Sequence, residues 1–297
     1  YLADAALAAA ACLGLPFSSA GHANDLYAHP GRLRLKMAAA AFVATCTGFN
    51  ERYLKNLCAA RGGEWAERLD ASRVVRVYHG VDLERFSPAP PERAAPRPGR
   101  LVSVTRLKEK KGFPYLLEAL ARLKARGLDV TLEIYGDGDR REAIEARVAQ
   151  LGLQDRVRLM GAVPHDRIPG VLAGTGLFVL PSVVLPDQDR DGIPNSILEA
   201  LASGVPVVST SISGIPEAVR HEQTGLLVPE RDAAALAEAI ERLMSDGRLR
   251  ARCARQGRRL VEASFSVEAS GRALAELLRL RGAAAGPRAD RRPAARA

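Results

Sequence analysis

Two carboxylates frame the stretch of the sequence that is best suited to chemistry. Asp191 closes an acid-rich loop, and Glu199 falls in the second turn of a predicted helix that follows a Gly-Ile-Pro segment. Pro194 suits the first helical position, because its missing N–H would have no intrahelical partner there. The free N–H groups of that turn would point back at the loop and attract an anion. The stretch therefore predicts an anion-binding turn close to two carboxylates.

A second group of candidate residues is basic and follows a predicted strand, Leu101–Val104. Arg106 and Lys111 flank the turn that leads from this strand into the next predicted helix. Cations beside a helix N-terminus are what a diphosphate needs, since point charge and backbone N–H groups act together. We therefore interpret Arg106 and Lys111 as phosphate-binding residues, and Lys108 and Lys110 as ordinary solvated lysines.

Three further positions carry weaker signals. His22 lies in a loop after a short predicted strand, and His79 precedes a Gly-Val-Asp segment. A lone histidine is more often structural than catalytic. Gly136 opens a Gly-Asp-Gly turn at the ligand-facing end of a strand, but this turn is not a G-x-G-x-x-G motif. None of the three positions identifies a site by itself.

The acid-rich loop also raises calcium as a rival ligand. The run Asp187–Gly192 matches the first half of a calcium loop of the form D-x-D-x-D-G-x5-E. That pattern requires Glu at position 198, where the sequence has Leu, and Pro194 interrupts the part that should continue extended. We therefore predict no metal site, and we interpret Asp187 and Asp189 as solvated loop acids.

These candidate residues lie between elements that alternate regularly after residue 100. Continuous apolar runs, typical of strands covered on both faces, alternate with helical patterns. The runs are Leu101–Val104, Thr131–Tyr135, Val157–Met160, Leu177–Leu180, Val205–Ser209 and Leu226–Val228. Such a β-α-β series predicts a parallel sheet with ligands at the carboxyl ends of its strands. Further helices are expected at about 231–244, 246–263 and 267–281.

The first part of the chain shows fewer elements. We expect strands at Pro16–Ala20, Phe42–Thr45 and Val74–Tyr78, and helices at 1–13 and from about residue 50. Since residue 1 is Tyr and lies inside a helical pattern, we expect the true beginning to be missing. The predicted organisation is a partial N-terminal domain at 1–87, a proline-rich linker at 88–99, a complete C-terminal domain at 100–265, a helix at 266–281 and a disordered tail at 282–297.

Composition limits the kinds of partner. A net charge of +9 with only 5% aromatic residues favours anionic ligands or a membrane surface over stacked nucleic acid. Four cysteines without a C-x-x-C pair or metal-ligand spacing favour a reducing compartment, and we expect them to be buried. No apolar run approaches the ~18 residues of a membrane-spanning helix.

In their order and spacing, the motifs of this sequence resemble those of the retaining glycosyltransferases of family 4, which have the GT-B fold, and the match is best from about 100 to 265. Pro16–Tyr27 is similar to the acceptor-side segment of members that act in exopolysaccharide or capsule synthesis. The resemblance implies an α/β fold with a complete C-terminal and a partial N-terminal Rossmann-like domain. The matching segments are His79–Asp82, Arg106–Leu107, Lys111–Gly112, Gly136–Gly138, Leu180–Ser182, Asp191–Glu199, Gly204–Val208, Gly214–Glu217 and Glu222–Leu227.

The resemblance also implies residue roles. Glu199 would bind the ribose hydroxyls of a nucleotide sugar, and Asp191, which replaces the family's first Glu, would contact the transferred sugar. Arg106 and Lys111 would hold the diphosphate, and His22 would lie over the reacting sugar. The implied catalytic set is His22, Asp191, Arg106 and Lys111; the substrate-binding set adds Gly136, Gly192, Ile193, Pro194, Asn195, Ser196 and Glu199, with no metal and no cofactor.

The resulting hypothesis is a metal-independent, retaining glycosyltransferase that moves a sugar from a UDP- or GDP-activated donor to a glycan or lipid-linked acceptor. We expect a cytoplasmic protein that contacts anionic lipid at the inner membrane face through Arg32, Arg34 and Lys36, unless these residues form only a solvated helix face. Two alternatives stay open: a chain that binds a nucleotide sugar without turnover, and a sugar-nucleotide epimerase of the same architecture. The sequence does not identify the base, the sugar, the acceptor or the linkage.

Overall fold

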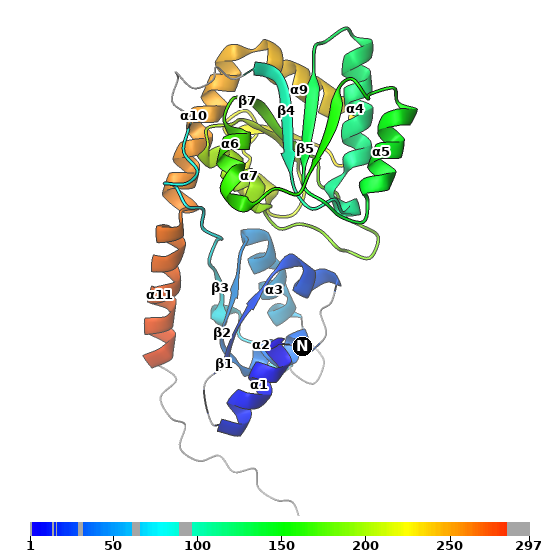
Figure 1. The fold of residues 1–297 in the computed structure, drawn as a ribbon. Helices are drawn as coiled ribbons and strands as arrows, with labels where there is room; N and C mark the ends of the chain where they lie inside the picture. The colour runs from blue at the N-terminus through cyan, green and yellow to red at the C-terminus, as the bar shows by residue number, and fades with distance from the viewer. Residues whose placement is uncertain are drawn as a thin grey trace, which may run out of the picture. The chain divides into compact units, whose positions relative to one another are not determined.

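The computed structural model describes residues 2–13, 15, 17–28, 32–60, 66–88 and 97–283. The chain divides into two compact units, Tyr1–Tyr78 with Ser270–Ala297, and His79–Ala269. Each unit contains a parallel sheet with helices packed on it (Figure 1), so the α/β class predicted from the sequence is confirmed.

The larger unit is built on a parallel sheet. Its strands are β4 (Arg97–Val104), β5 (Thr131–Tyr135), β6 (Val157–Gly161), β7 (Thr175–Leu180), β8 (Val207–Thr210) and β9 (Gly225–Val228). They lie in the order β6-β5-β4-β7-β8-β9. Leu101 of β4 is paired with Leu132 of β5 on one side and with Leu177 of β7 on the other. The strand order reverses between β4 and β7, and ligands bind at such a switch point, outside the carboxyl ends of the strands.

Helices connect these strands and bury them. The elements are α4 (Phe113–Ala125), α5 (Arg141–Gln150), α6 (Ile168–Leu172), α7 (Asn195–Ala202), α8 (Ile215–Ala218), α9 (Ala233–Ser245) and α10 (Gly247–Ser264), with short 3-10 turns η4 (Glu109–Lys111) and η5 (His165–Arg167). Leu116, Leu120 and Leu123 follow one another at helical spacing on α4 and are no more than 2% exposed. They join the sheet residues in one hydrophobic core, in which α4 packs against α9.

The segment after Tyr78 belongs to the larger unit, so the boundary between the two units lies nine residues before the predicted end of the N-terminal domain at residue 87. Val81 forms a parallel bridge with Ser266, and a Cβ on Gly80 would lie 2.4 Å from the Val267 Cα. Only a glycine permits so close an approach of two backbones. The helix α11 (Val267–Ala283) then begins within the larger unit and continues in the smaller one.

Two further predictions about chain organisation need correction. β4 begins at Arg97, so positions 97–99 of the predicted linker are strand. Pairing with β7 explains this extension, because Arg97 is the register partner of Thr175 and its N–H donates to the Gly174 carbonyl at 3.4 Å. α11 includes positions 282 and 283 of the predicted tail. Residues 89–96 of the linker and 284–297 of the tail lie outside the described residues.

The smaller unit has a parallel sheet of three strands among its described residues, in the order β1-β2-β3. Its elements are α1 (Leu2–Leu13), β1 (Phe17–Gly21), the π-helical turn η1 (Asn24–Ala28), α2 (Leu33–Ala39), β2 (Ala40–Thr45), α3 (Gly48–Ala59), η2 (Ala66–Arg68), η3 (Ala71–Arg73) and β3 (Val74–Arg76). Thr47 caps α3 by accepting a hydrogen bond from the Asn50 N–H at 3.0 Å. Phe17, Leu26 and Leu54 form part of its buried core.

Two expectations from composition can be compared with the structure. None of the four cysteines forms a disulfide, but only Cys253 is fully buried and Cys12 is exposed, so the expectation of general burial is wrong. Cys12 lies on α1, outside either hydrophobic core. Among the described helices, none combines the length and the apolar character that spanning a membrane requires.

Candidate active site

The loops after β4 and β7 meet at the switch point of the larger sheet. The backbone N–H of Val183 donates to the Lys110 carbonyl at 2.8 Å. Gly112 has a φ of +69°, and a Cβ there would lie 1.9 Å from the Pro181 carbonyl oxygen. Glycine alone combines this left-handed backbone with so close a contact. The sequence therefore brings Lys110 and Lys111 beside the residues that follow β7.

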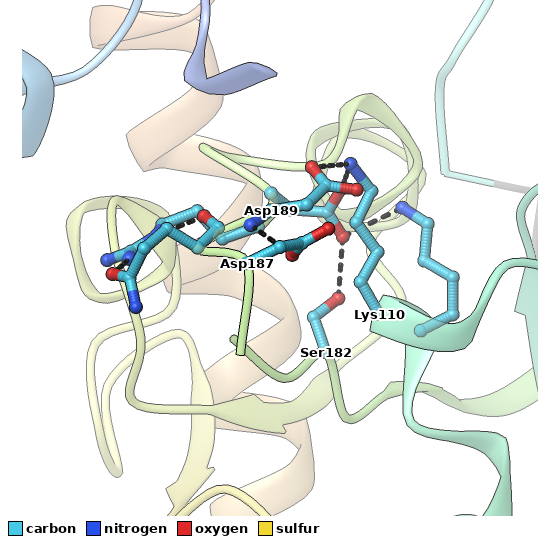
Figure 2. A network of polar contacts seen from close by, with 8 residues as sticks. Lys110, Ser182, Asp187 and Asp189 are labelled. Atoms are coloured by element: carbon cyan, nitrogen blue, oxygen red, sulfur yellow. Dashed lines mark hydrogen bonds and ion pairs between the residues drawn. The ribbon is translucent and has the colours of Figure 1, made fainter. Parts of the chain in front are cut away.

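Two lysines, a serine and two aspartates form a network of polar contacts at this point (Figure 2). Lys111 Nζ lies 2.8 Å from Asp191 Oδ2, and Ser182 Oγ donates to the same oxygen at 2.8 Å. Lys110 Nζ lies 2.8 Å from Asp189 Oδ1 and 3.8 Å from Asp191 Oδ1. The Lys111 and Asp191 side chains are only 10% and 11% exposed, so their ion pair is largely removed from water.

The interpretation of Lys110 and Asp189 as solvated residues is wrong, because their side chains are 14% and 24% exposed and pair with each other. Two hydrogen bonds within the loop fix the backbone of Asp189. The Asp189 N–H donates to Asp187 Oδ1 at 2.9 Å, and the Asp189 carbonyl accepts from the Leu185 N–H at 2.9 Å. Lys108 differs from Lys110, since it is 45% exposed and pairs with a carboxylate at the surface.

The helix α7 carries Glu199 in its second turn, as predicted. It begins at Asn195, so the placement of Pro194 at its first position is wrong by one residue. Pro194 is the N-cap, with an extended ψ of 129°, and a proline φ of −59° fits this position equally well. Glu199 is 8% exposed, and its Oε1 lies 2.9 Å from Nε2 of His165.

His165, the partner of Glu199, is a further candidate site residue that was not predicted from the sequence. It lies in η5, after β6, and its side chain is 58% exposed. Its ring lies against that of Phe86, with centroids 5.5 Å apart. The one signal that could have found it is its place in a loop at the carboxyl end of a strand, where ligand-binding residues gather.

The turn that leads into α7 carries the remaining residues implied by the resemblance. Asn195 Oδ1 lies 3.2 Å from His79 Nδ1, which links the start of α7 to the segment that precedes β4. The first N–H groups of a helix have no intrahelical acceptor, which suits an anion at this end. Along the turn, Pro194 is buried, Asn195 is exposed, and Gly192, Ile193 and Ser196 are half-buried.

Arg106 and Gly136 lie together on the loops after β4 and β5. Gly136 has a φ of +137°, and a Cβ there would lie 1.8 Å from the Thr105 carbonyl oxygen and 3.6 Å from the Arg106 nitrogen. The Arg106 side chain is exposed, and no residue in the described ranges forms a hydrogen bond or ion pair with its guanidinium. Arg106 and Lys111 follow the same strand, but no contact joins them among the described residues.

His22 lies in the smaller unit, directly after β1. Its side chain is 52% exposed, and its Nδ1 lies 3.6 Å from Asp25 Oδ2. Its backbone N–H donates to the same oxygen at 3.1 Å. The role of His22 over the reacting sugar stays a prediction.

This arrangement suits an anionic ligand that also carries hydroxyl groups. A buried ammonium, an exposed guanidinium and a helix N-terminus lie at the carboxyl edge of one sheet. Since Lys111 is paired with Asp191, an incoming anion must share or displace that partner. The Glu199 carboxylate, on the helix that starts at this edge, offers acceptor oxygens for hydroxyl groups.

Comparisons with known proteins point to one family. The family model described as Glycosyl transferases group 1 matches residues 89–260. WcaL of Escherichia coli (strain K12), provisionally named a colanic acid biosynthesis glycosyltransferase, is 38% identical over 222 residues, which cover 72% of this chain and 54% of WcaL. AmsK of Erwinia amylovora, an amylovoran biosynthesis glycosyltransferase, is 37% identical over 213 residues, which cover 72% of this chain and 51% of AmsK. The chain thus spans about half the length of these two relatives.

A solved structure of similar fold is that of Anabaena HepE in complex with UDP and glucose. It covers 93% of this chain and 75% of its own, with a TM-score of 0.75 and 21% sequence identity. At that identity the likeness concerns the fold alone, and it confirms the predicted GT-B-like architecture. The family match covers residues 89–260, which is more than half of the 297-residue chain and includes the polar network at the switch point. The chain therefore belongs to the group 1 glycosyltransferases.

Proposed function

We propose that this chain transfers a sugar from a nucleoside-diphosphate sugar to a glycan or lipid-linked acceptor in the synthesis of a cell-surface polysaccharide. The observation that carries the proposal is the buried Lys111–Asp191 ion pair at the switch point, in a chain of a glycosyltransferase family. The names of WcaL and AmsK, which refer to colanic acid and amylovoran biosynthesis, support the acceptor class. The complexes of HepE with UDP and with UDP-glucose support the donor class.

In this proposal the larger unit binds the donor. Breaking the bond between sugar and diphosphate builds negative charge on the leaving group, and Arg106 and Lys111 would meet that charge. Asp191 would accept a hydrogen bond from the transferred sugar, and Glu199 would accept hydrogen bonds from the ribose. His22 of the smaller unit would contact the reacting sugar. Retention of the anomeric configuration and independence of metal ions are parts of the same proposal.

Donor-dependent transfer tests this function. UDP-, GDP- and ADP-sugars are screened by thermal shift, since a specific ligand raises the Tm by mass action, and transfer of radiolabelled sugar is then measured. We expect Lys111→Ala to lower kcat/KM at least about tenfold, since losing one donor to a developing charge costs about 10²–10³ in rate. We expect Glu199→Ala to lower kcat/KM at least about tenfold as well, because it removes the acceptor for the ribose hydroxyls. Lys124→Ala is the control, because its ammonium contacts only surface groups, the Asp155 carboxylate and the Gly152 carbonyl, each at 2.7 Å.

The outcomes separate the candidate functions. Unchanged transfer in both variants would refute the site assignment. Calorimetric binding of a nucleotide sugar, with neither transfer nor hydrolysis, would support the alternative of binding without turnover. Conversion of the donor sugar into another sugar in the absence of an acceptor would indicate an epimerase.

The proposal extends to the location of the chain in the cytoplasm, with peripheral contact at the inner face of the membrane. Arg32 precedes α2, and Arg34 and Lys36 lie on it. Basic residues near an anionic surface are attracted by about 1 kcal/mol each. Lys36 also pairs with Asp4 at 3.2 Å. Sedimentation with vesicles that contain or lack phosphatidylglycerol tests the contact. Equal binding to both kinds of vesicle would contradict it, and so would unchanged binding of the double variant Arg32→Glu, Arg34→Glu.

A further inference from the structure

Asp191 has two cations within reach, and they are not equivalent. Lys111 Nζ lies 2.8 Å from Oδ2, whereas Lys110 Nζ lies 3.8 Å from Oδ1. The Asp191 side chain is 11% exposed, so water does little to screen its charge. The inference below rests on the proposed function, in which a donor diphosphate takes Lys111 as its ligand.

Diphosphate binding changes the surroundings of Asp191 under that function. When Lys111 turns toward phosphate, Asp191 keeps the Ser182 hydroxyl at 2.8 Å and the more distant Lys110. A buried carboxylate without a cation is unfavourable, because its desolvation is no longer compensated. Asp191 would then lose its fixed position at the moment when the sugar has to be held.

Lys110 is placed to prevent this loss. Its side chain is 14% exposed, and its ammonium is held by Asp189 at 2.8 Å (Figure 2). Asp189 is itself fixed, because its N–H donates to Asp187 and its carbonyl accepts from Leu185. Lys110 is therefore held beside Asp191 by contacts that do not involve Lys111 or Ser182.

We propose that Lys110 and Asp189 are positioning residues for sugar transfer, which keep Asp191 paired and in place while Lys111 binds the diphosphate. Lys110 acts through Asp191 and does not touch the phosphates. The nucleoside diphosphate alone makes no contact with Asp191. Loss of Lys110 should therefore impair the handling of the sugar more than the binding of the nucleotide.

The test compares UDP with UDP-glucose, and GDP with GDP-mannose in parallel, by calorimetry and transfer kinetics. We expect Lys110→Met and Asp189→Asn to lower kcat about tenfold and to leave the Kd of the nucleoside diphosphate within about twofold of the original. Lys110→Arg keeps the charge and should recover most of the activity. Lys108→Met is the matched control, because Lys108 lies in the same loop and makes an ion pair of 2.8 Å with Asp139, but at the surface.

Any of the following results would overturn the inference. If Lys110→Met weakens UDP and UDP-glucose equally, Lys110 is a phosphate ligand and not a positioning residue. If Lys110→Met behaves like Lys108→Met, the pair with Asp189 has no role in transfer. If Lys110→Arg fails while its Tm is unchanged, the charge is not what matters. If the unmodified chain binds none of these four ligands and no ADP-sugar either, the proposed function fails first and this inference with it.

Discussion

Lys110 and Lys111 are neighbours in the chain, yet each makes its shortest ion pair with a different aspartate. Both lie in the 3-10 turn η4, in which successive side chains point about 120° apart. Lys110 therefore reaches Asp189 while Lys111 reaches Asp191. Two adjacent residues thus supply two cations that can act separately.

His165 provides a test of the Glu199 role at the scale of one hydrogen bond. Its Nε2 lies 2.9 Å from Glu199 Oε1 and helps to hold that carboxylate. If Glu199 binds the ribose, His165→Ala should raise the donor KM severalfold with little change in kcat, since the ribose does not react. His165→Gln, whose amide nitrogen can replace Nε2, should restore the KM.

The control for His165 is His221→Ala. His221 has a similar exposure of 54% and also lies near a glutamate, with Nε2 3.8 Å from Glu222 Oε1. If His165→Ala and His221→Ala change the KM equally, or if His165→Ala lowers only kcat, His165 does not help Glu199 to bind the donor.

Cys253 gives a pH-dependent contribution to stability. Burial raises the pKa of its thiol to about 11, whereas a solvated thiol has a pKa of about 8.5. Because the folded pKa is the higher one, the contribution is complete below about pH 8.5 and is lost as the pH rises toward the folded pKa. The free energy of unfolding is measured by urea denaturation at about pH 8 and at about pH 10.5. Between these two pH values we expect the original chain to lose about 2 kcal/mol more of this free energy than Cys253→Ala does. An equal loss of unfolding free energy in the original chain and in Cys253→Ala would contradict this account.

At the scale of elements, the contact between the β4 and β7 loops depends on Gly112. Gly112→Ala would combine a left-handed backbone with a Cβ 1.9 Å from the Pro181 carbonyl oxygen. Gly127→Ala is the matched control, since Gly127 has a φ of +76° and nothing lies within 4 Å of an added Cβ. We expect Gly127→Ala to cost about 1 kcal/mol of unfolding free energy and Gly112→Ala clearly more.

The Gly112 change should also weaken donor binding, because it separates Lys111 from Asp191. Urea denaturation and UDP titration of both variants provide the measurements. A Gly112→Ala chain as stable as Gly127→Ala, or one that binds UDP normally, would show that the close loop contact is not needed.

The strands could be predicted because their apolar runs are continuous. The run Thr131–Tyr135 is β5 without change, and the run at Leu177 differs only in that β7 begins at Thr175. The beginning of β4 at Arg97 could not be predicted, because it depends on the pairing of Arg97 with Thr175 of β7 and not on a hydrophobic pattern.

The same limit applies to the site. Asp191 and Glu199 could be singled out because they share one short motif. The pairing of Lys110 with Asp189, and of His165 with Glu199, joins residues that are 79 and 34 positions apart. No local pattern encodes such contacts, because they depend on which loops the sheet order brings together.

At the scale of the whole molecule, the net charge of +9 should favour anionic ligands over a distance. We expect the Kd of UDP to rise severalfold between about 0.05 M and about 0.5 M KCl, since salt shortens the range of electrostatic attraction. Uridine, which lacks the diphosphate, should show no such dependence. Calorimetry at several salt concentrations measures both, and equal behaviour of UDP and uridine would exclude an electrostatic role.

The two units differ in how the chain builds them. The larger one is the continuous stretch His79–Ala269, while the smaller one combines both ends of the chain. A continuous stretch can be exchanged through two junctions, near Tyr78 and Ala269, with its sheet and all its loops intact. The architecture therefore permits recombination to replace the larger unit as a whole, and under the proposed function such an exchange would alter donor choice while the sequence of the smaller unit stays the same.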